Sequence, residues 1–250
     1  IALHSSNWRS VYINKPLAPG LAPPDLTAWF NQQFKWARGV FELFLTTYWR
    51  TLSHLTTGQR LSYGVRMTYY WIGLVFAVHL STTMGVLFSR SETALAAYEN
   101  YLLHLLPLAA ASALIRIVAL RYYAYPSLKQ MMREGAILQW KPLLLVLSTW
   151  PVYVLAWLLA LLRVPLAYRP TAKQVAGLGP KVTWIWPQIL AVVGLLLAGL
   201  VTQSTIGFNN YPLVLASATI LALVQLGLLV EAWREAVAMS SNGKQIRDQI

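Results

Sequence analysis

Apolar residues gather in five long stretches along the chain, and the shorter segments between them carry most of the charged residues. These stretches span residues 67–88, 101–120, 143–162, 184–201 and 211–230. Each is long enough, or nearly so, to cross about 30 Å of hydrocarbon as an α-helix, which satisfies its own backbone polar groups in lipid. Composition agrees, since 57% of the residues are hydrophobic and 11% are charged. The pattern predicts an all-α membrane protein.

The distribution of Lys and Arg predicts how the chain is oriented, because cytoplasmic segments keep an excess of these residues. Seven of them precede the first stretch, and the segments 121–141 and 163–181 hold four each, whereas 89–100 holds one beside two Glu residues. The stretch 143–162 therefore has cytoplasmic charge on both sides, and Pro151 lies near its middle. We expect it to be re-entrant or interfacial, with about four transmembrane helices elsewhere and both chain ends in the cytoplasm.

Residues 26–48, ahead of the first stretch, have the pattern of an amphipathic helix lying along the cytoplasmic face of the membrane. Asp25 is a suitable N-cap after Pro23 and Pro24. One stripe of the helix is apolar and would bury in the membrane interface: Phe30, Phe34, Ala37, Phe41, Phe44 and Tyr48. The opposite side carries Gln32, Lys35, Trp36 and Gly39.

Two interpretations of this polar side follow. It can be the wet face of a membrane anchor, which is common for such helices. It can also be a sugar platform, because the flat ring of Trp36 suits a pyranose, the neighbouring amides suit hydroxyls, and Lys35 suits a phosphate.

The motif QQFKW at residues 32–36 resembles the Q-Q-x-R-W signature of processive family 2 glycosyltransferases, the cellulose synthase-like enzymes. The preceding NWRSVYINKPLAPGLAPPDL resembles the last strand and the Gly-Leu-Ala-Pro turn of their catalytic domain. The resemblance implies that Trp36 stacks on the acceptor sugar and that Gln32, Gln33 and Lys35 face the acceptor and the nucleotide diphosphate. Lys35 departs from the signature, since Lys lacks the planar fork with which Arg binds a phosphate.

A second segment, YRPTAK at residues 168–173, resembles the F-x-V-T-x-K gating loop of cellulose synthases. The resemblance implies that Tyr168, Thr171 and Lys173 fold over the bound nucleotide sugar, although Pro170 replaces an aliphatic residue. Such a short segment alone is often a plain loop. Its place beside QQFKW on the predicted cytoplasmic side favours the gating interpretation.

The resemblance divides the chain into three parts. Residues 1–24 would be the end of a cytosolic glycosyltransferase domain of the GT-A α/β type, 25–60 the interface helix, and 61–250 the transmembrane region with a gating-like loop at 163–181. Family members hold Mg²⁺ or Mn²⁺ and a carboxylate base in that cytosolic domain. The acids before the first stretch here are Asp25 and Glu42, and neither fits such a motif. Because the chain begins at Ile1, we expect a fragment that is inactive alone.

We therefore predict the C-terminal part of a glycosyltransferase of the inner membrane. It would transfer sugar from a nucleotide sugar, expected to be UDP-linked, to a growing polysaccharide and carry the product across, with an export complex as a partner. A multispan transporter or channel and a structural subunit of a polysaccharide secretion complex are the alternatives. The charge of +12 is scattered, which does not indicate nucleic acid, and a chain with no Cys and four unclustered His residues predicts no metal site. Gln188, Gln203 and Gln225 could line a polymer path.

Overall fold

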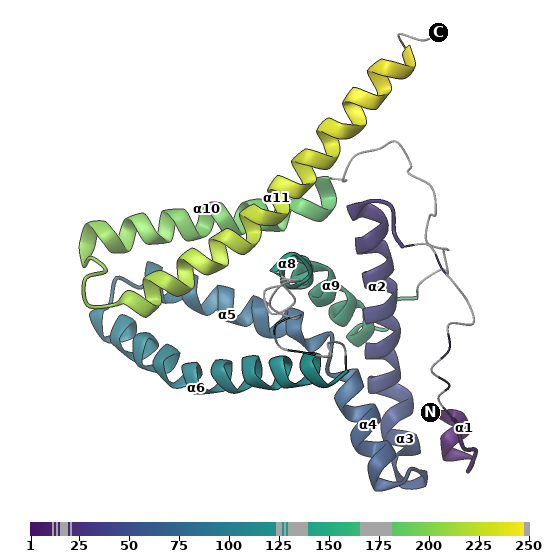
Figure 1. The fold of residues 1–250 in the computed structure, drawn as a ribbon. Coiled ribbons are helices and arrows are strands. Elements are labelled where there is room, and N and C mark those ends of the chain that lie inside the picture. Colours follow the sequence, from purple (N-terminus) through teal and green to yellow (C-terminus); the bar gives the residue numbers. More distant parts are fainter. Residues whose placement is uncertain are drawn as a thin grey trace. The chain divides into compact units, whose positions relative to one another are not determined.

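The computed structural model describes residues 1–11, 13, 15, 20, 22–123, 127, 129, 140–165 and 182–247. Over this part of the chain the regular structure is helical, without a strand. The short helical elements are α1 (Ala2–Ser5), the π-helical turn η1 (Phe44–Tyr48), α3 (Trp49–Thr51) and the 3₁₀ turn η2 (Leu52–His54). The longer helices are α2 (Leu26–Leu43), α4 (Thr57–Met67), α5 (Trp71–Phe88), α6 (Glu92–Tyr123), α8 (Trp140–Ser148), α9 (Trp150–Leu161), α10 (Val182–Thr205) and α11 (Pro212–Arg247) (Figure 1).

Four helical segments are long and apolar enough to cross a membrane: Trp71–Phe88, Glu92–Tyr122, Trp184–Thr205 and Pro212–Ala238. This confirms the predicted all-α membrane protein with about four spans. The second span begins earlier than expected, because the helix already starts at Glu92. Residues 1–24 contain α1 and no strand among their described positions.

The third apolar stretch, residues 143–162, is broken. Its two halves, Pro142–Ser148 and Trp150–Leu161, are bent by 42°, as in either a broken span or a re-entrant segment. The bend falls at Thr149, the N-cap of α9, and Pro151 lies in the first turn of that helix, where its missing N–H costs nothing. Whether this stretch crosses the membrane stays a prediction.

The chain forms two compact units. The first comprises Ile1–Val78, Thr149–Pro187 and Leu229–Ile250, and the second comprises His79–Ser148 and Gln188–Leu228. In the second unit, the hydroxyl of Tyr98 is hydrogen-bonded to Thr83 at 2.6 Å and to Nδ1 of His79 at 3.2 Å, and Nε2 of His79 reaches Ser217 at 3.1 Å. His79 is therefore a hydrogen-bonded residue between helices, as intramembrane polar groups commonly are.

The core of the first unit lies where α2 packs against α9 and the start of α5. Its buried members are Ala37, Phe41, Tyr70, Tyr153, Ala156 and Ala160. The small side chains Ala156 and Ala160 let α2 approach closely. Burial raises the pKa of Tyr70 to about 12, helped by the neighbouring Tyr69, so its hydroxyl stays protonated.

This packing corrects one prediction about the interface helix. The helix itself is confirmed, because α2 continues through η1 without a break. Its apolar stripe was expected to bury in the membrane interface, but the structure covers Phe30, Ala37 and Phe41 completely with other parts of the same chain. Apolar residues pack equally well against lipid and against protein, so the pattern alone did not distinguish the two.

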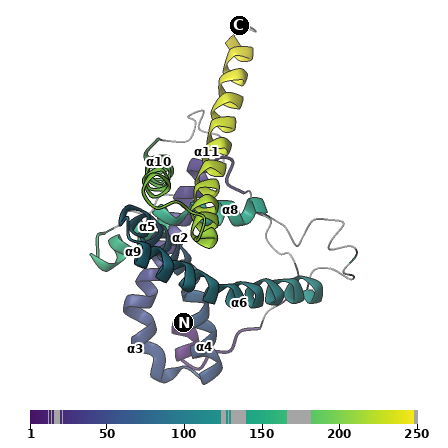
Figure 2. The same ribbon diagram turned by 90° about the vertical axis from the view of Figure 1, so that its left-hand side faces the viewer.

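Helix α4 begins with a capping box, in which Thr56 accepts from the N–H of Gln59 and the Gln59 side chain accepts from the N–H of Thr56. The helix lies beside the end of the α2 run (Figures 1 and 2). There the hydroxyl of Tyr48 donates to the carbonyl of Arg60 at 3.0 Å. The far end of the α2 run is thus held by α4.

Candidate functional site

The start of α2 is fixed by two carboxylates. Asp25 is the N-cap, and its side chain accepts from the N–H of Ala28 at 2.6 Å, which confirms the predicted cap. Glu235 of α11 accepts from the N–H of Leu26 at 3.2 and 3.3 Å through its two oxygens. Both negative charges complement the positive end of the helix. Glu235 lies 209 residues further along the chain, so the local sequence gave no sign of it.

One face of α2 is bound to α9 by polar contacts inside the apolar seam. The indole N–H of Trp29 donates to the hydroxyl of Thr149 at 3.3 Å, and the hydroxyl of Tyr153 donates to Oε1 of Gln33 at 3.1 Å. Further along, Nη2 of Arg38 donates to the carbonyl of Val164 at 3.0 Å. Gln33 and Arg38 are 4% and 6% exposed. This side is the packed face of α2.

The carbonyl that Arg38 meets is presented by the way α9 ends. The N–H of Val164 bonds to the carbonyl of Leu159, and the N–H of Arg163 bonds to that of Ala160, both at 3.1 Å. These two bonds form a Schellman motif, with Arg163 in the left-handed conformation at φ 54°. The chain therefore turns back after α9, and its carbonyl comes within reach of α2.

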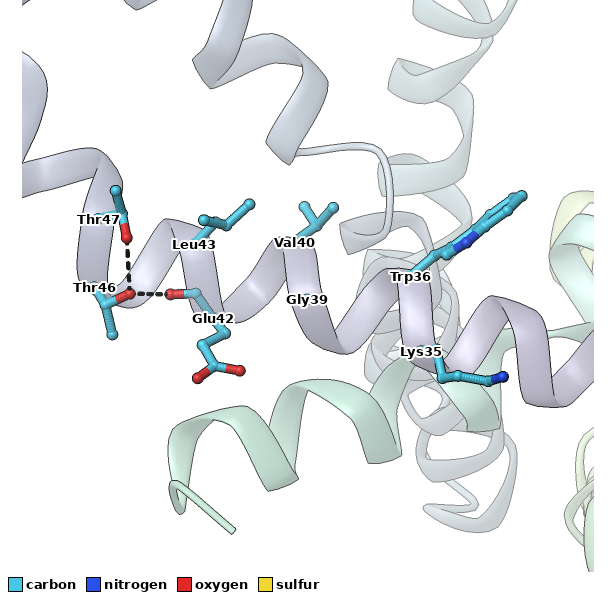
Figure 3. Close-up of a pocket in the computed structure, with 8 residues that line it drawn as sticks. All are labelled: Lys35, Trp36, Gly39, Val40, Glu42, Leu43, Thr46 and Thr47. Atoms are coloured by element: carbon cyan, nitrogen blue, oxygen red, sulfur yellow. Dashed lines mark hydrogen bonds between the residues drawn. The ribbon is translucent and has the colours of Figure 1, made fainter. Parts of the chain in front are cut away.

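The other side of α2 is open and forms a shallow groove of about 570 Å³ (Figure 3). One wall carries Trp36, Val40, Leu43 and Thr47, and the other carries Lys35, Glu42 and Thr46. Gly39 lies between them, and a Cβ added there would meet no atom within 4 Å. Trp36 is 54% exposed. This side is the open face of α2.

The far end of the groove is made by the π-helical turn. Thr46 donates to the carbonyl of Glu42 at 2.6 Å, and its hydroxyl lies 3.4 Å from that of Thr47. Glu42 is paired with Arg38 through one oxygen at 3.2 Å, although its side chain is 61% exposed. The wider turn brings two consecutive hydroxyls to the groove, and π-helical turns are frequent at functional sites.

The structure separates the residues that the sequence grouped together. Lys35 and Trp36 both line the groove, Gln32 is partly exposed outside it, and Gln33 lies on the packed face instead. Tyr168, Thr171 and Lys173 of the expected gating loop lie outside the described residues.

Five groove residues were not predicted: the polar Glu42, Thr46 and Thr47 and the apolar Val40 and Leu43. Helical spacing could have indicated them, because residues three, four or seven apart share one face of a helix: Glu42 is seven residues from Lys35, and Thr46 is seven from Gly39.

An open ring, a carboxylate, two hydroxyls and an ammonium group along one groove can bind a sugar chain by stacking and hydrogen bonding. Among the described residues, no three His, Cys, Asp or Glu side chains come close enough together to hold a metal ion. In the second unit, Gln188 and Gln225 are fully buried, and Nε2 of Gln188 donates to the carbonyl of Ser148 at 2.9 Å. Gln203 is exposed.

Comparison with known proteins finds relatives that are named cellulose synthases. The chain is 24% identical over 256 aligned residues to the UDP-forming cellulose synthase catalytic subunit of Pseudomonas fluorescens (strain SBW25), which covers 100% of this chain and 32% of that protein. It is 31% identical over 88 residues to the UDP-forming cellulose synthase 1 catalytic subunit of Komagataeibacter xylinus, covering 35% and 12%. It is 35% identical over 85 residues to the UDP-forming cellulose synthase A catalytic subunit 6 of Arabidopsis thaliana, covering 32% and 8%.

The chain thus spans a third or less of the length of these curated relatives. No family model and no solved structure matches it. The resemblance predicted from the residues is confirmed at the level of these relatives: the chain is similar to cellulose synthase catalytic subunits.

Proposed function

We propose that this chain is the membrane part of a processive family 2 glycosyltransferase. The enzyme would transfer sugar from a UDP-linked donor to a growing polysaccharide and move the product across the inner membrane. The observation that carries the proposal is the open groove of α2, where the exposed ring of Trp36 and the charge of Lys35 lie side by side in the QQFKW motif. The names of the relatives, UDP-forming cellulose synthases, agree with this chemistry.

Each part of the site has a role in this proposal. Trp36 stacks on the terminal sugar of the acceptor, Lys35 faces the nucleotide diphosphate, and Gln32 bonds to a substrate hydroxyl. Tyr168, Thr171 and Lys173 close over the donor as a gating loop. Residues 1–24 are the end of a cytosolic glycosyltransferase domain that supplies the Mg²⁺ or Mn²⁺ ligands and the carboxylate base, so this chain alone makes no polymer.

The charges along the groove indicate which end serves which substrate. Lys35 lies at one end and Glu42 lies two helical turns further on, beside Thr46 and Thr47. A diphosphate is attracted to the first end and repelled by the carboxylate at the other. A neutral sugar chain has no such penalty, and its hydroxyls can donate to Glu42 and bond to the two threonines. We therefore place the acceptor chain along the Glu42 end.

The direct test is Trp36→Ala in the full-length protein, with polymer elongation measured from radiolabelled UDP-glucose. We expect elongation to be lost while UDP binding and membrane insertion are kept, because the lost contact is stacking on the acceptor. Trp36→Phe should retain part of the activity. Trp49→Ala is the matched control, since Trp49 is similarly exposed at 58% on the same helical run but does not line the groove. Normal elongation by Trp36→Ala would contradict the proposal and leave the α2 run as a membrane anchor.

We also propose that residues 143–162 do not cross the membrane and that both chain ends are cytoplasmic. The chain has no cysteine, so single cysteines can be introduced at Ser127 and Thr171, on either side of this stretch. Both should react with a membrane-impermeant maleimide only when the reagent reaches the cytoplasmic side. Labelling of the two positions from opposite sides would show a true span and would also remove the gating interpretation.

A further inference from the structure

The polar contacts between α2 and α9 follow a regular order. Trp29 meets Thr149 and Gln33 meets Tyr153, with the same separation of 120 residues in both pairs. Arg38 then meets Val164, further along both segments. Rising numbers on both sides show that the two helices run in the same direction and in one register. A slip of one turn would break the contacts of Trp29 and Gln33 together.

The bond between Gln33 and Tyr153 is the most enclosed of these contacts. The Gln33 side chain is 4% exposed and Tyr153 is fully buried. The ring of Tyr153 stacks edge-on to Tyr70 at 5.2 Å, and a Cβ added to Gly73 would come within 2.5 Å of its Cβ. Tyr153 therefore cannot move aside, and its hydroxyl is a donor with a fixed position. A buried polar pair in an apolar seam penalises every other register, since a shift would leave both groups without partners.

This fixed contact bears on Trp36 through the geometry of the helix. At about 100° per residue, Gln33 and Trp36 point about 60° apart around α2 and lie within one turn of each other. All the residues that line the groove lie on α2 and η1, so a rotation of α2 against α9 would turn the groove and the ring of Trp36 together, away from the direction that they now face. The hydrogen bond from Tyr153 to Gln33 opposes that rotation close to the ring itself.

We infer that Gln33 is a positioning residue, which accepts the hydrogen bond of Tyr153 and thereby sets the direction in which Trp36 presents its ring to the acceptor. This inference rests on the proposed function. It differs from the expectation for QQFKW, in which both glutamines face the substrates.

The experiment separates positioning from plain stability. Tyr153→Phe leaves the amide of Gln33 buried without its donor, so the melting temperature of the purified chain in detergent should fall. The double variant Gln33→Met with Tyr153→Phe removes both polar groups at similar volume and should restore it. Acceptor KM and UDP-glucose KM are then measured in the full-length protein with a glucose oligosaccharide of the cellulose type as acceptor.

We expect the double variant to remain defective although its stability has returned. Acceptor efficiency should fall by up to about 100-fold, the scale for a misplacement near 1 Å, while the KM for UDP-glucose is unchanged. Recovery of acceptor KM together with stability would overturn the inference, as would an equal rise in the KM of both substrates. Tyr98→Phe, which loses a buried hydroxyl contact in the second unit, should lower stability without changing acceptor KM.

The result is distinct from a failure of the proposed function. If Trp36→Ala elongates normally, the groove does not serve the acceptor at all. If Trp36→Ala fails and the double variant is fully active, the groove serves the acceptor but Gln33 does not position it.

Discussion

The packed and open faces of α2 belong to one helix and differ in what their polar groups contact. On the packed face, Gln33 and Arg38 are buried and bond to fixed partners on the α9 segment. On the open face, Trp36 and Glu42 extend into a groove. The comparison shows that polar residues of one motif can divide between two tasks, with those that hold the helix on one side and those that meet a ligand on the other.

The largest expected difference between the faces is in stability. Phe41 is fully buried against the rings of Tyr70 and Trp71, so Phe41→Ala should lower the free energy of unfolding by about 3 to 5 kcal/mol. Leu43 lines the groove and is 43% exposed, and Leu43→Ala should stay within about 0.5 kcal/mol of wild type. Unfolding by SDS titration in mixed micelles measures both. Equal losses of unfolding free energy in Phe41→Ala and Leu43→Ala would mean that the open face is packed in the membrane.

A smaller effect is expected at Arg38, which connects the faces. Arg38→Met removes the hydrogen-bond donor to the carbonyl of Val164. It should lower the free energy of unfolding by about 1 to 2 kcal/mol, because Val164 is partly exposed. Glu42→Gln weakens the ion pair between the buried Arg38 and the exposed Glu42 and should lower the free energy of unfolding by about 0 to 1 kcal/mol. The same titration compares the two variants. If Glu42→Gln proved the more costly, the ion pair rather than the link to Val164 would be the main role of Arg38.

A small change of the opposite sign, a gain in stability, is expected at Gly39 on the open face. Gly39→Ala adds a methyl group that clashes with nothing, and it should stabilise the helix by up to about 1 kcal/mol. The methyl group would occupy the floor of the groove, so acceptor efficiency should fall by about tenfold or more.

Gly199→Ala is the matched control for this substitution. Gly199 is also inside a helix with no atom within 4 Å of an added Cβ, and it is outside the groove. The Gly199→Ala variant should gain similar stability and keep its activity. If Gly39→Ala were more stable and fully active, the groove would not be the acceptor site.

Much of the candidate site followed from the sequence because it depends on neighbouring residues. The cap at Asp25, the helix through Tyr48 and the shared side of Lys35, Trp36 and Gly39 all follow from cap chemistry and the 3.6-residue period. The apolar stretches likewise predicted four long membrane helices, since length and apolar content are properties of each segment alone.

The tertiary structure decided which surfaces the helix faces meet. An apolar stripe suits lipid and protein alike, so only the path of the chain places α9, rather than membrane, against Phe41 and Ala37. The partner of Gln33 lies 120 residues away and the second cap of α2 lies 209 residues away, and no local rule connects them. Hydrogen bonds over such separations form only after the helices have packed, because packing is what brings the donor within about 3 Å of its acceptor.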